Sequence, residues 1–152
     1  IVVPERKPLI LRRKLFSAPR TYVDGRILGE NGARMSGCGL HRFLLWRTWG
    51  DGPRLPFIML NPSTADASVD DPTIRRCIGF ARKYETYGGI FIANLFSLRA
   101  TDPNELILSR EDACPQGNLD ALLEVVDYAL IKNVPIVCGW GANVEKMRAR
   151  AY

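Results

Sequence analysis

Phe57-Ile-Met-Leu-Asn-Pro-Ser-Thr-Ala-Asp66 runs from an apolar stretch straight into a polar loop. The unbroken apolar run, over about residues 55 to 60, predicts a strand that is buried on both faces, as in parallel sheets. Ligands of such sheets gather beyond the carboxyl ends of the strands. We therefore expect the chemistry of this chain in the segment that follows, whose side chains include Asn61, Pro62, Ser63, Thr64, Asp66, Asp70 and Asp71.

The residues after this loop predict a capped helix. Asp71 is placed to be its N-cap and Pro72 its first residue, where the missing N–H of proline costs nothing. Helical spacing puts apolar residues on one side and basic residues on the other. The expected inner residues are Ile74, Cys77, Ile78 and Ala81, and the expected outer residues are Arg75, Arg76, Arg82 and Lys83.

Beyond Pro56 the chain alternates strand, helix, strand, helix, strand, with strands at about 55–60, 89–96 and 134–140. This order predicts an α/β fold with a central, mostly parallel sheet between helices. The second helix is expected to bury Leu119, Leu122, Leu123, Val126 and Leu130. Residues 21–54 predict antiparallel strands, with a hairpin at Asp24-Gly25, a loop over 29–39 and a strand over 41–49.

The size and composition predict a single domain over residues 1–152. With 47% hydrophobic residues, the chain can form one core. No apolar run approaches the roughly 20 residues that a membrane span requires, so we expect a soluble, cytoplasmic protein. Four cysteines without metal-ligand spacing predict free thiols, with Cys77 and Cys138 as small core residues. The sequence predicts no cofactor and gives no oligomeric state.

The net charge of +5 is concentrated at the amino terminus. Residues 1–20 hold six basic side chains and one acidic side chain, and Arg12-Arg13-Lys14 is the densest group. Such an arm can bind the phosphates of a nucleic acid, or it can be a solvated terminal segment. Both interpretations remain open at this point.

Two further strand ends carry polar or aromatic candidates for substrate binding. Asn94 lies at the tip of an apolar strand, where a buried carboxamide must bond a neighbouring loop or face a ligand. Phe96 and Arg99 follow, and Arg99 can pair with Asp66, Asp70 or a phosphate. Trp140, between two glycines, offers an indole for stacking or for the core.

These motifs resemble the domain of unknown function 1643 family of bacteria and phages. The resemblance covers roughly residues 35 to 142. It rests on Met59-Leu-Asn-Pro-Ser-Thr-Ala-Asp66, Asp71-Pro-Thr-Ile-Arg-Arg-Cys77, Asn94-Leu-Phe-Ser-Leu-Arg-Ala-Thr-Asp-Pro103 and Gly139-Trp-Gly141. The family name implies no activity.

The order of these motifs also resembles, more distantly, that of mismatch-specific uracil-DNA glycosylases. It implies a three-layer α/β/α sandwich in which Asn61 orients the attacking water and Asn94 and Arg99 lie near the base or the backbone. The chain departs from that pattern at Ser63, where the glycosylases usually have Gly, and in its acidic trio of Asp66, Asp70 and Asp71. A Gly-x-Pro-x-His-Pro stretch, which family members tend to carry near the carboxyl end, is not found up to Tyr152, and the resemblance therefore implies a missing element.

Three functions follow as hypotheses. The first is a hydrolase of N-glycosidic bonds acting on a nucleobase, nucleotide or DNA, in which Asn61 positions water and Asp66 or Asp70 takes its proton or stabilises the cationic sugar. A flipped base would then stack on Trp140 or Phe96. The second is a metal-dependent phosphohydrolase or transferase that uses Asp66, Asp70 and Asp71. The third is a nucleic-acid or nucleotide-binding module without turnover.

Overall fold

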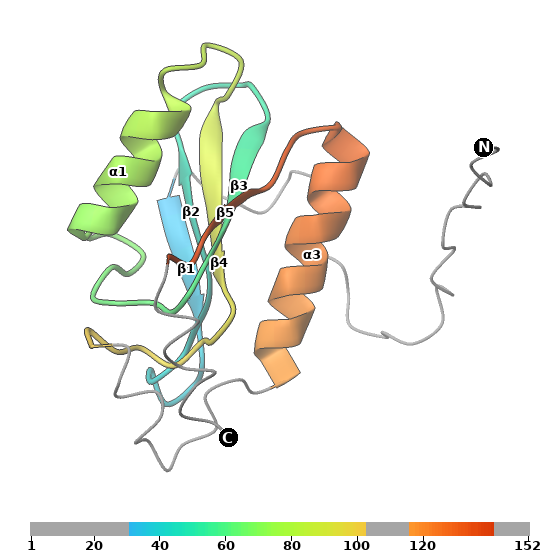
Figure 1. Ribbon diagram of the computed structural model, residues 1–152. Helices are drawn as coiled ribbons and strands as arrows, with labels where there is room; N and C mark the ends of the chain where they lie inside the picture. Colours follow the sequence, from blue (N-terminus) through green and yellow to red (C-terminus); the bar gives the residue numbers. More distant parts are fainter. Residues whose placement is uncertain (1–30, 103–115, 142–152) are drawn as a thin grey trace, which may run out of the picture.

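The strand predicted at 55–60 lies inside the sheet as β3 (Arg54–Met59), between β4 (Gly89–Asn94) and β5 (Val137–Gly139) (Figure 1). The computed structural model describes residues 31–102 and 116–141. The basic arm, the Asp24-Gly25 hairpin and Cys114 lie outside them. β3 pairs in parallel with both neighbours, and β4 is buried along its whole length. The three strands expected after Pro56 therefore form a parallel unit.

The sheet as a whole is mixed, so the prediction of a mostly parallel sheet was wrong. β1 (Asn31–Met35) pairs with β2 (Arg42–Thr48), and β2 pairs with β4, both in antiparallel orientation. The resulting order is β1-β2-β4-β3-β5. The antiparallel pair extends the parallel unit because β4 would otherwise leave the backbone groups of one edge unpaired.

β1 lies within the segment that the sequence predicted as a loop, so that prediction was also wrong. The glycine of this strand, Gly32, is needed for close packing and does not form a turn. A Cβ atom at Gly32 would collide with the indole of Trp46 on the paired strand β2. Glycine inside a strand often marks such a close approach.

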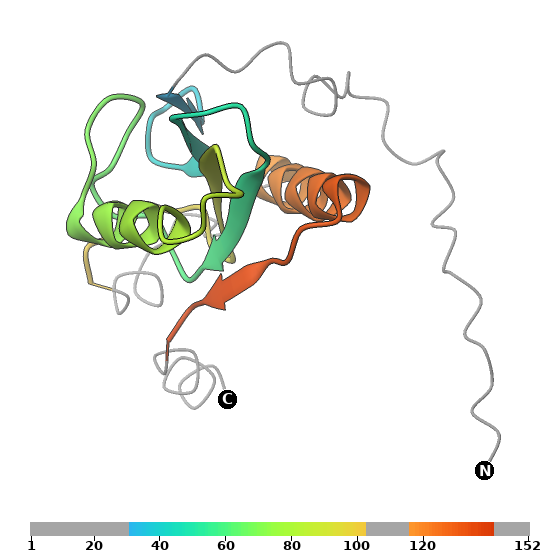
Figure 2. The same cartoon turned by 90° about the horizontal axis from the view of Figure 1, so that it is seen from above.

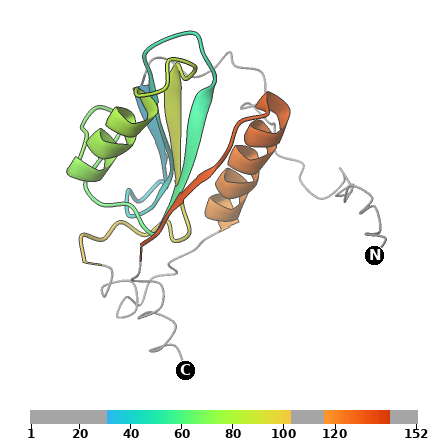
Figure 3. The same ribbon diagram turned by 45° about the horizontal axis from the view of Figure 1, so that its top comes forward.

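One helix covers each face of the sheet. α1 (Pro72–Ala81) connects β3 to β4, and α3 (Gln116–Lys132) lies between β4 and β5 in the chain (Figures 2 and 3). The two connections run in opposite directions across the sheet, and right-handed crossovers then place their helices on opposite faces. Within the described residues, no helix is long and apolar enough to cross a membrane.

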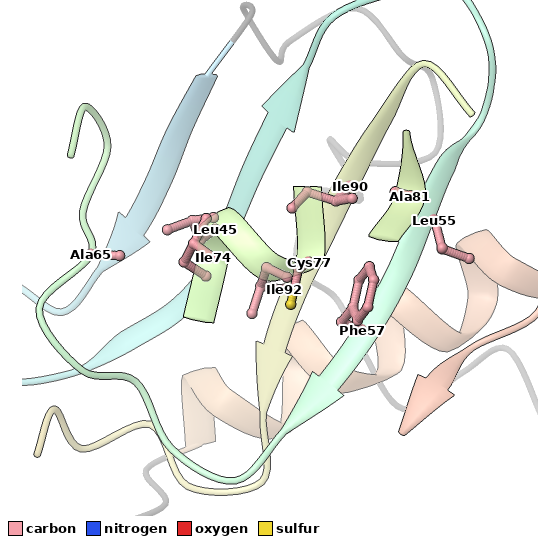
Figure 4. Packing of buried hydrophobic residues seen from close by; sticks show 9 residues of the cluster. All are labelled: Leu45, Leu55, Phe57, Ala65, Ile74, Cys77, Ala81, Ile90 and Ile92. Atoms are coloured by element: carbon pink, nitrogen blue, oxygen red, sulfur yellow. The ribbon is translucent and has the colours of Figure 1, made fainter. Parts of the chain in front are cut away.

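α1 begins as the sequence predicted. Asp71 is the N-cap, and its carboxylate accepts a hydrogen bond from the backbone N–H of Ile74 at 2.9 Å. The inner side of the helix packs on β2, β3 and β4 (Figure 4). The buried cluster consists of Leu45, Leu55, Phe57, Ala65, Ile74, Cys77, Ala81, Ile90 and Ile92.

α3 faces the sheet through a side that agrees with the predicted one only at Leu122, which packs against the buried cluster around Phe91 and Val125. Leu119 and Leu130 are exposed, and the buried positions are Asn118, Ala121, Val125, Tyr128 and Ala129. The Tyr128 ring packs edge-on against Phe91, with centroids 4.9 Å apart, and its hydroxyl accepts a hydrogen bond from the backbone of Arg54. Alanines allow the helix to approach the sheet, whereas the leucine spacing fits a helix equally well and so gave the wrong face.

Two of the described cysteines differ sharply in burial. Cys77 is buried, as predicted, whereas Cys138 is exposed on the edge strand β5, so its prediction as a core residue was wrong. Burial, with a smaller effect from the charge of Asp71, raises the pKa of the Cys77 thiol to about 11. Only about one thiol in a thousand would be ionised there at pH 8.

Iodoacetamide at pH 8 is therefore expected to alkylate Cys38 and Cys138, which are exposed, and to leave Cys77 unmodified, because the thiolate is the reacting form. Peptide mass mapping after a short pulse measures this. In 6 M guanidinium, as a control, Cys77 should react as fast as the other two. Equal labelling in the native protein would contradict the burial of this thiol.

Candidate functional site

The polar ends of β3 and β4 form one crevice. These adjacent parallel strands send their connections to opposite faces of the sheet, which is the arrangement that opens a binding crevice in α/β proteins. Their extensions stay paired beyond the strands, because Leu95, Phe96 and Ala100 donate backbone hydrogen bonds to Met59, Leu60 and Pro62, each at 2.9 Å. This pairing brings the predicted residues Asn61 and Asn94 to the same place.

A cavity of about 180 Å³ lies at this edge. Five residues that the sequence analysis named for the chemistry line it: Asn61, Ser63, Asp71, Asn94 and Trp140. Trp140 is 38% exposed, so its interpretation as a core residue does not hold. The remaining lining residues are Arg42, Met59, Leu60, Thr73, Ile74, Ile92 and Gly139.

Asn61 is held by backbone carbonyl groups. Its Nδ2 donates to the carbonyl of Ala100 at 2.7 Å and to that of Pro62 at 3.1 Å. These two bonds fix the orientation of the carboxamide, and no hydrogen bond reaches Oδ1 from the residues that the structure describes. Oδ1 is therefore an oriented acceptor on a residue that lines the cavity.

A guanidinium group lies buried beside Asn94. Arg42 of β2 is 2% exposed and Asn94 is 1% exposed. Arg42 donates through Nη1 to the carbonyl of Ala65 at 2.9 Å and through Nη2 to Oδ1 of Asn94 at 3.3 Å. Among described atoms, Nε of Arg42 and Nδ2 of Asn94 have no hydrogen-bond partner. Arg42 and Asn94, two residues of the cavity lining, thus each hold a buried donor without an acceptor, and such groups are costly unless a ligand or water meets them.

Asp71 supplies the nearby negative charge. Desolvation lowers the pKa of Arg42 to about 10, while the charge of Asp71 opposes that shift, so Arg42 is cationic at neutral pH. The carboxylate of Asp71 accepts hydrogen bonds from the backbone N–H groups of Ile74 and Ala65, at 2.9 and 3.4 Å. The cap of α1 is thus also the counter-charge of the buried arginine.

The other two acids of the trio do not line the cavity. The carboxylate of Asp66 accepts hydrogen bonds from the backbone of Ser68 and Val69, each at 2.9 Å, and these hold its pKa below the ordinary value. Asp70 forms an ion pair with Arg47 at 2.7 Å. In the described parts of the chain, no three His, Cys, Asp or Glu side chains come together as a possible metal site.

The remaining predicted residues support the loops without lining the cavity. Arg99 donates to the carbonyls of Ser63 and Thr64, at 3.3 and 3.2 Å. Its charge makes a small contribution to the lowered pKa of Asp66, whereas Asp70 pairs with Arg47. Phe96 packs against Leu98 and Ala100. Pro62 is buried, and its carbonyl receives the bonds from Asn61 and Ala100.

Sequence reasoning missed Arg42 and Arg47. Both are nearly fully buried, and both donate to backbone carbonyls of the segment after β3, Arg42 to Ala65 and Arg47 to Asp66. The available signal was two arginines within an otherwise apolar strand, because arginine is almost never buried without partners.

Comparison with protein-family models gives a match to "Protein of unknown function (DUF1643)" over residues 42–152. The chain belongs to this family. The match begins at the buried arginine Arg42 and includes every residue that lines the cavity. No curated protein and no solved structure matches the chain.

Proposed function

We propose that this member of the DUF1643 family hydrolyses the N-glycosidic bond of a nucleobase-bearing substrate, on a three-layer fold related to that of mismatch-specific uracil-DNA glycosylases. The observation that carries the proposal is the cavity at the carboxyl ends of β3 and β4. Its lining residues include Asn61, whose Oδ1 is an oriented acceptor, and Arg42 and Asn94, each of which has a buried donor without a partner.

In this proposal the acceptor and the donors have different roles. A water molecule that donates to Oδ1 of Asn61 turns its lone pair toward the sugar carbon. The C–N bond breaks as the water oxygen bonds to that carbon, the bonding electrons leave with the base, and the base gains the proton that water loses. Nε of Arg42 and Nδ2 of Asn94 would stabilise the charge that develops on a carbonyl oxygen of the departing base.

The size of the cavity supports a base as the group that enters. Its volume of about 180 Å³ lies below the roughly 300–1,000 Å³ typical of sites for drug-sized ligands. A single ring system can enter, while the sugar stays at the mouth. The partly exposed indole of Trp140 offers the entering ring a stacking surface.

The metal-dependent alternative has less support. It needs Asp66, Asp70 and Asp71 as a group of ligands, but each carboxylate has a separate role: a loop turn, an ion pair with Arg47 and a helix cap. The three carboxylates therefore do not form one oxygen-lined site of the kind that magnesium prefers.

The test is a screen for release of free base by chromatography. Purified protein is incubated with nucleosides, nucleotides and single- and double-stranded DNA containing modified bases, with and without EDTA. We expect release of a carbonyl-bearing base that EDTA does not reduce. EDTA-sensitive release of phosphate would favour the metal-dependent alternative, and binding without any product would favour a recognition module.

A further inference from the structure

The outward side of α1 and of the turn after it is strongly basic. Its four cations are exposed, no acidic residue occurs from Pro72 to Tyr84, and the turn contains one exposed acid, Glu85. None of the four lies within 4 Å of a carboxylate in the described residues, so their charge is not neutralised by ion pairs. The four side chains, called here the α1 basic face, are Arg75, Arg76, Arg82 and Lys83.

Exposed aromatic rings accompany these cations. Phe80 is 41% exposed and Tyr84 is 50% exposed, and their ring centroids are 5.6 Å apart. Tyr84 also contacts the ring of Tyr87 at 6.1 Å. Phe80 follows Arg76 by four residues and therefore lies beside it on the helix. Rings that are restrained by neighbours and still open to solvent can stack on a partner at a small cost in side-chain entropy.

α3, on the other face of the sheet, is less basic than α1. It carries Asp120, Glu124 and Asp127 against the single cation Lys132, and Glu124 is paired with Arg34 at 3.2 Å. A polyanion is therefore attracted more strongly to α1 than to α3. This asymmetry is independent of the basic segment at residues 1–20.

We propose that the α1 basic face binds single-stranded nucleic acid. Phosphates would meet the cations, and unpaired bases would stack on Tyr84 and Phe80, which is the combination that single-strand binding proteins use. A membrane surface is disfavoured because the apolar side of α1 is already buried against the sheet. None of the four cations lines the cavity, so this binding does not depend on the proposed hydrolysis.

The experiment measures fluorescence anisotropy of a labelled 20-mer of thymidine with the full chain over a range of salt concentrations. Lys83→Glu is compared with Lys132→Glu, which makes the same charge change at an exposed lysine on the other side of the sheet. We expect Lys83→Glu to weaken binding at least about fivefold and to reduce the slope of log K against log salt by about 0.7. Lys132→Glu should stay within about twofold of the wild type.

Tyr84→Ala separates stacking from charge. It should weaken binding to the single strand about fivefold or more and leave binding to the same sequence as a duplex almost unchanged, because paired bases do not expose their faces. A matching 20-mer of uridine tests whether RNA shares the surface. Equal losses for Lys83→Glu and Lys132→Glu, duplex binding as tight as single-strand binding, or preference for vesicles with 30% phosphatidylserine would each overturn the proposal.

Discussion

Replacement of Asn61 by alanine is expected to reduce base release by about a hundredfold or more. Oδ1 of Asn61 is the acceptor that would orient the attacking water, and two carbonyls hold the carboxamide in place. Alanine removes this acceptor but leaves the donors of Arg42 and Asn94, which would still receive the base. The loss should therefore fall on the turnover number more than on KM.

A folding defect must be separated from this catalytic effect. Asn61→Ala removes two side-chain hydrogen bonds, and each contributes about 1 kcal/mol, so the variant should remain folded with a modestly lower free energy of unfolding. Its affinity for the thymidine 20-mer should be unchanged because the α1 basic face lies outside the cavity. Asn31→Ala, at an exposed asparagine, is the matched control and should retain full turnover. Full turnover in Asn61→Ala would contradict the proposed role.

The local features of the fold were predictable because neighbouring residues determine them. Asp71-Pro72 combines an N-cap side chain with a proline that fits the first helical position, and α1 begins there. The apolar run before Asn61 likewise requires a buried strand, and β3 has parallel partners on both sides. Each of these predictions rests on a few consecutive residues.

Features that depend on distant residues were not predictable in the same way. The pairing of β2 with β4 joins residues more than forty positions apart, and no local pattern specifies it. Gly32 was predicted as a loop residue because the reason for its glycine is not local. The indole of Trp46, on another strand, fills the space that a side chain at Gly32 would need. The buried side of α3 was predicted wrongly because its leucines and its alanines line two different sides of the helix. Only the shape of the sheet decides which side packs against it.

The candidate site divides in the same way. Asn61 and Asn94 were found because polar residues at the ends of apolar strands are locally unusual, and the parallel pairing of β3 and β4 brings them together. The acidic trio was overinterpreted, since closeness in sequence does not place three carboxylates around one point. The carboxylate of Asp66 accepts hydrogen bonds from its own loop, and the carboxylate of Asp70 pairs with Arg47. Arg42 was missed because its partners, Ala65 and Asn94, are distant in sequence.

Replacement of Arg42 by methionine is expected to lower the free energy of unfolding by about 3 kcal/mol. Methionine preserves much of the apolar contact of the side chain but leaves Oδ1 of Asn94 and the carbonyl of Ala65 without the donors that they have now. It also leaves Asp71 buried without its neighbouring cation. Urea unfolding followed by circular dichroism measures the change. Arg76→Met, at an exposed arginine, is the control and should cost no more than about 0.5 kcal/mol.

Two further variants test whether the hydrogen bond to Asn94 carries part of this effect. In a double-mutant cycle, Arg42→Met should cost about 1 kcal/mol less in an Asn94→Ala background, because the orphaned oxygen is then gone. Additive losses would place the role of Arg42 elsewhere, in its bond to Ala65 or its charge. Arg42→Lys keeps the charge without the guanidinium geometry and should lie between wild type and Arg42→Met. Since Nη2 of Arg42 fixes the orientation of the Asn94 amide, this lysine variant should also discriminate less between carbonyl-bearing and amino-bearing bases.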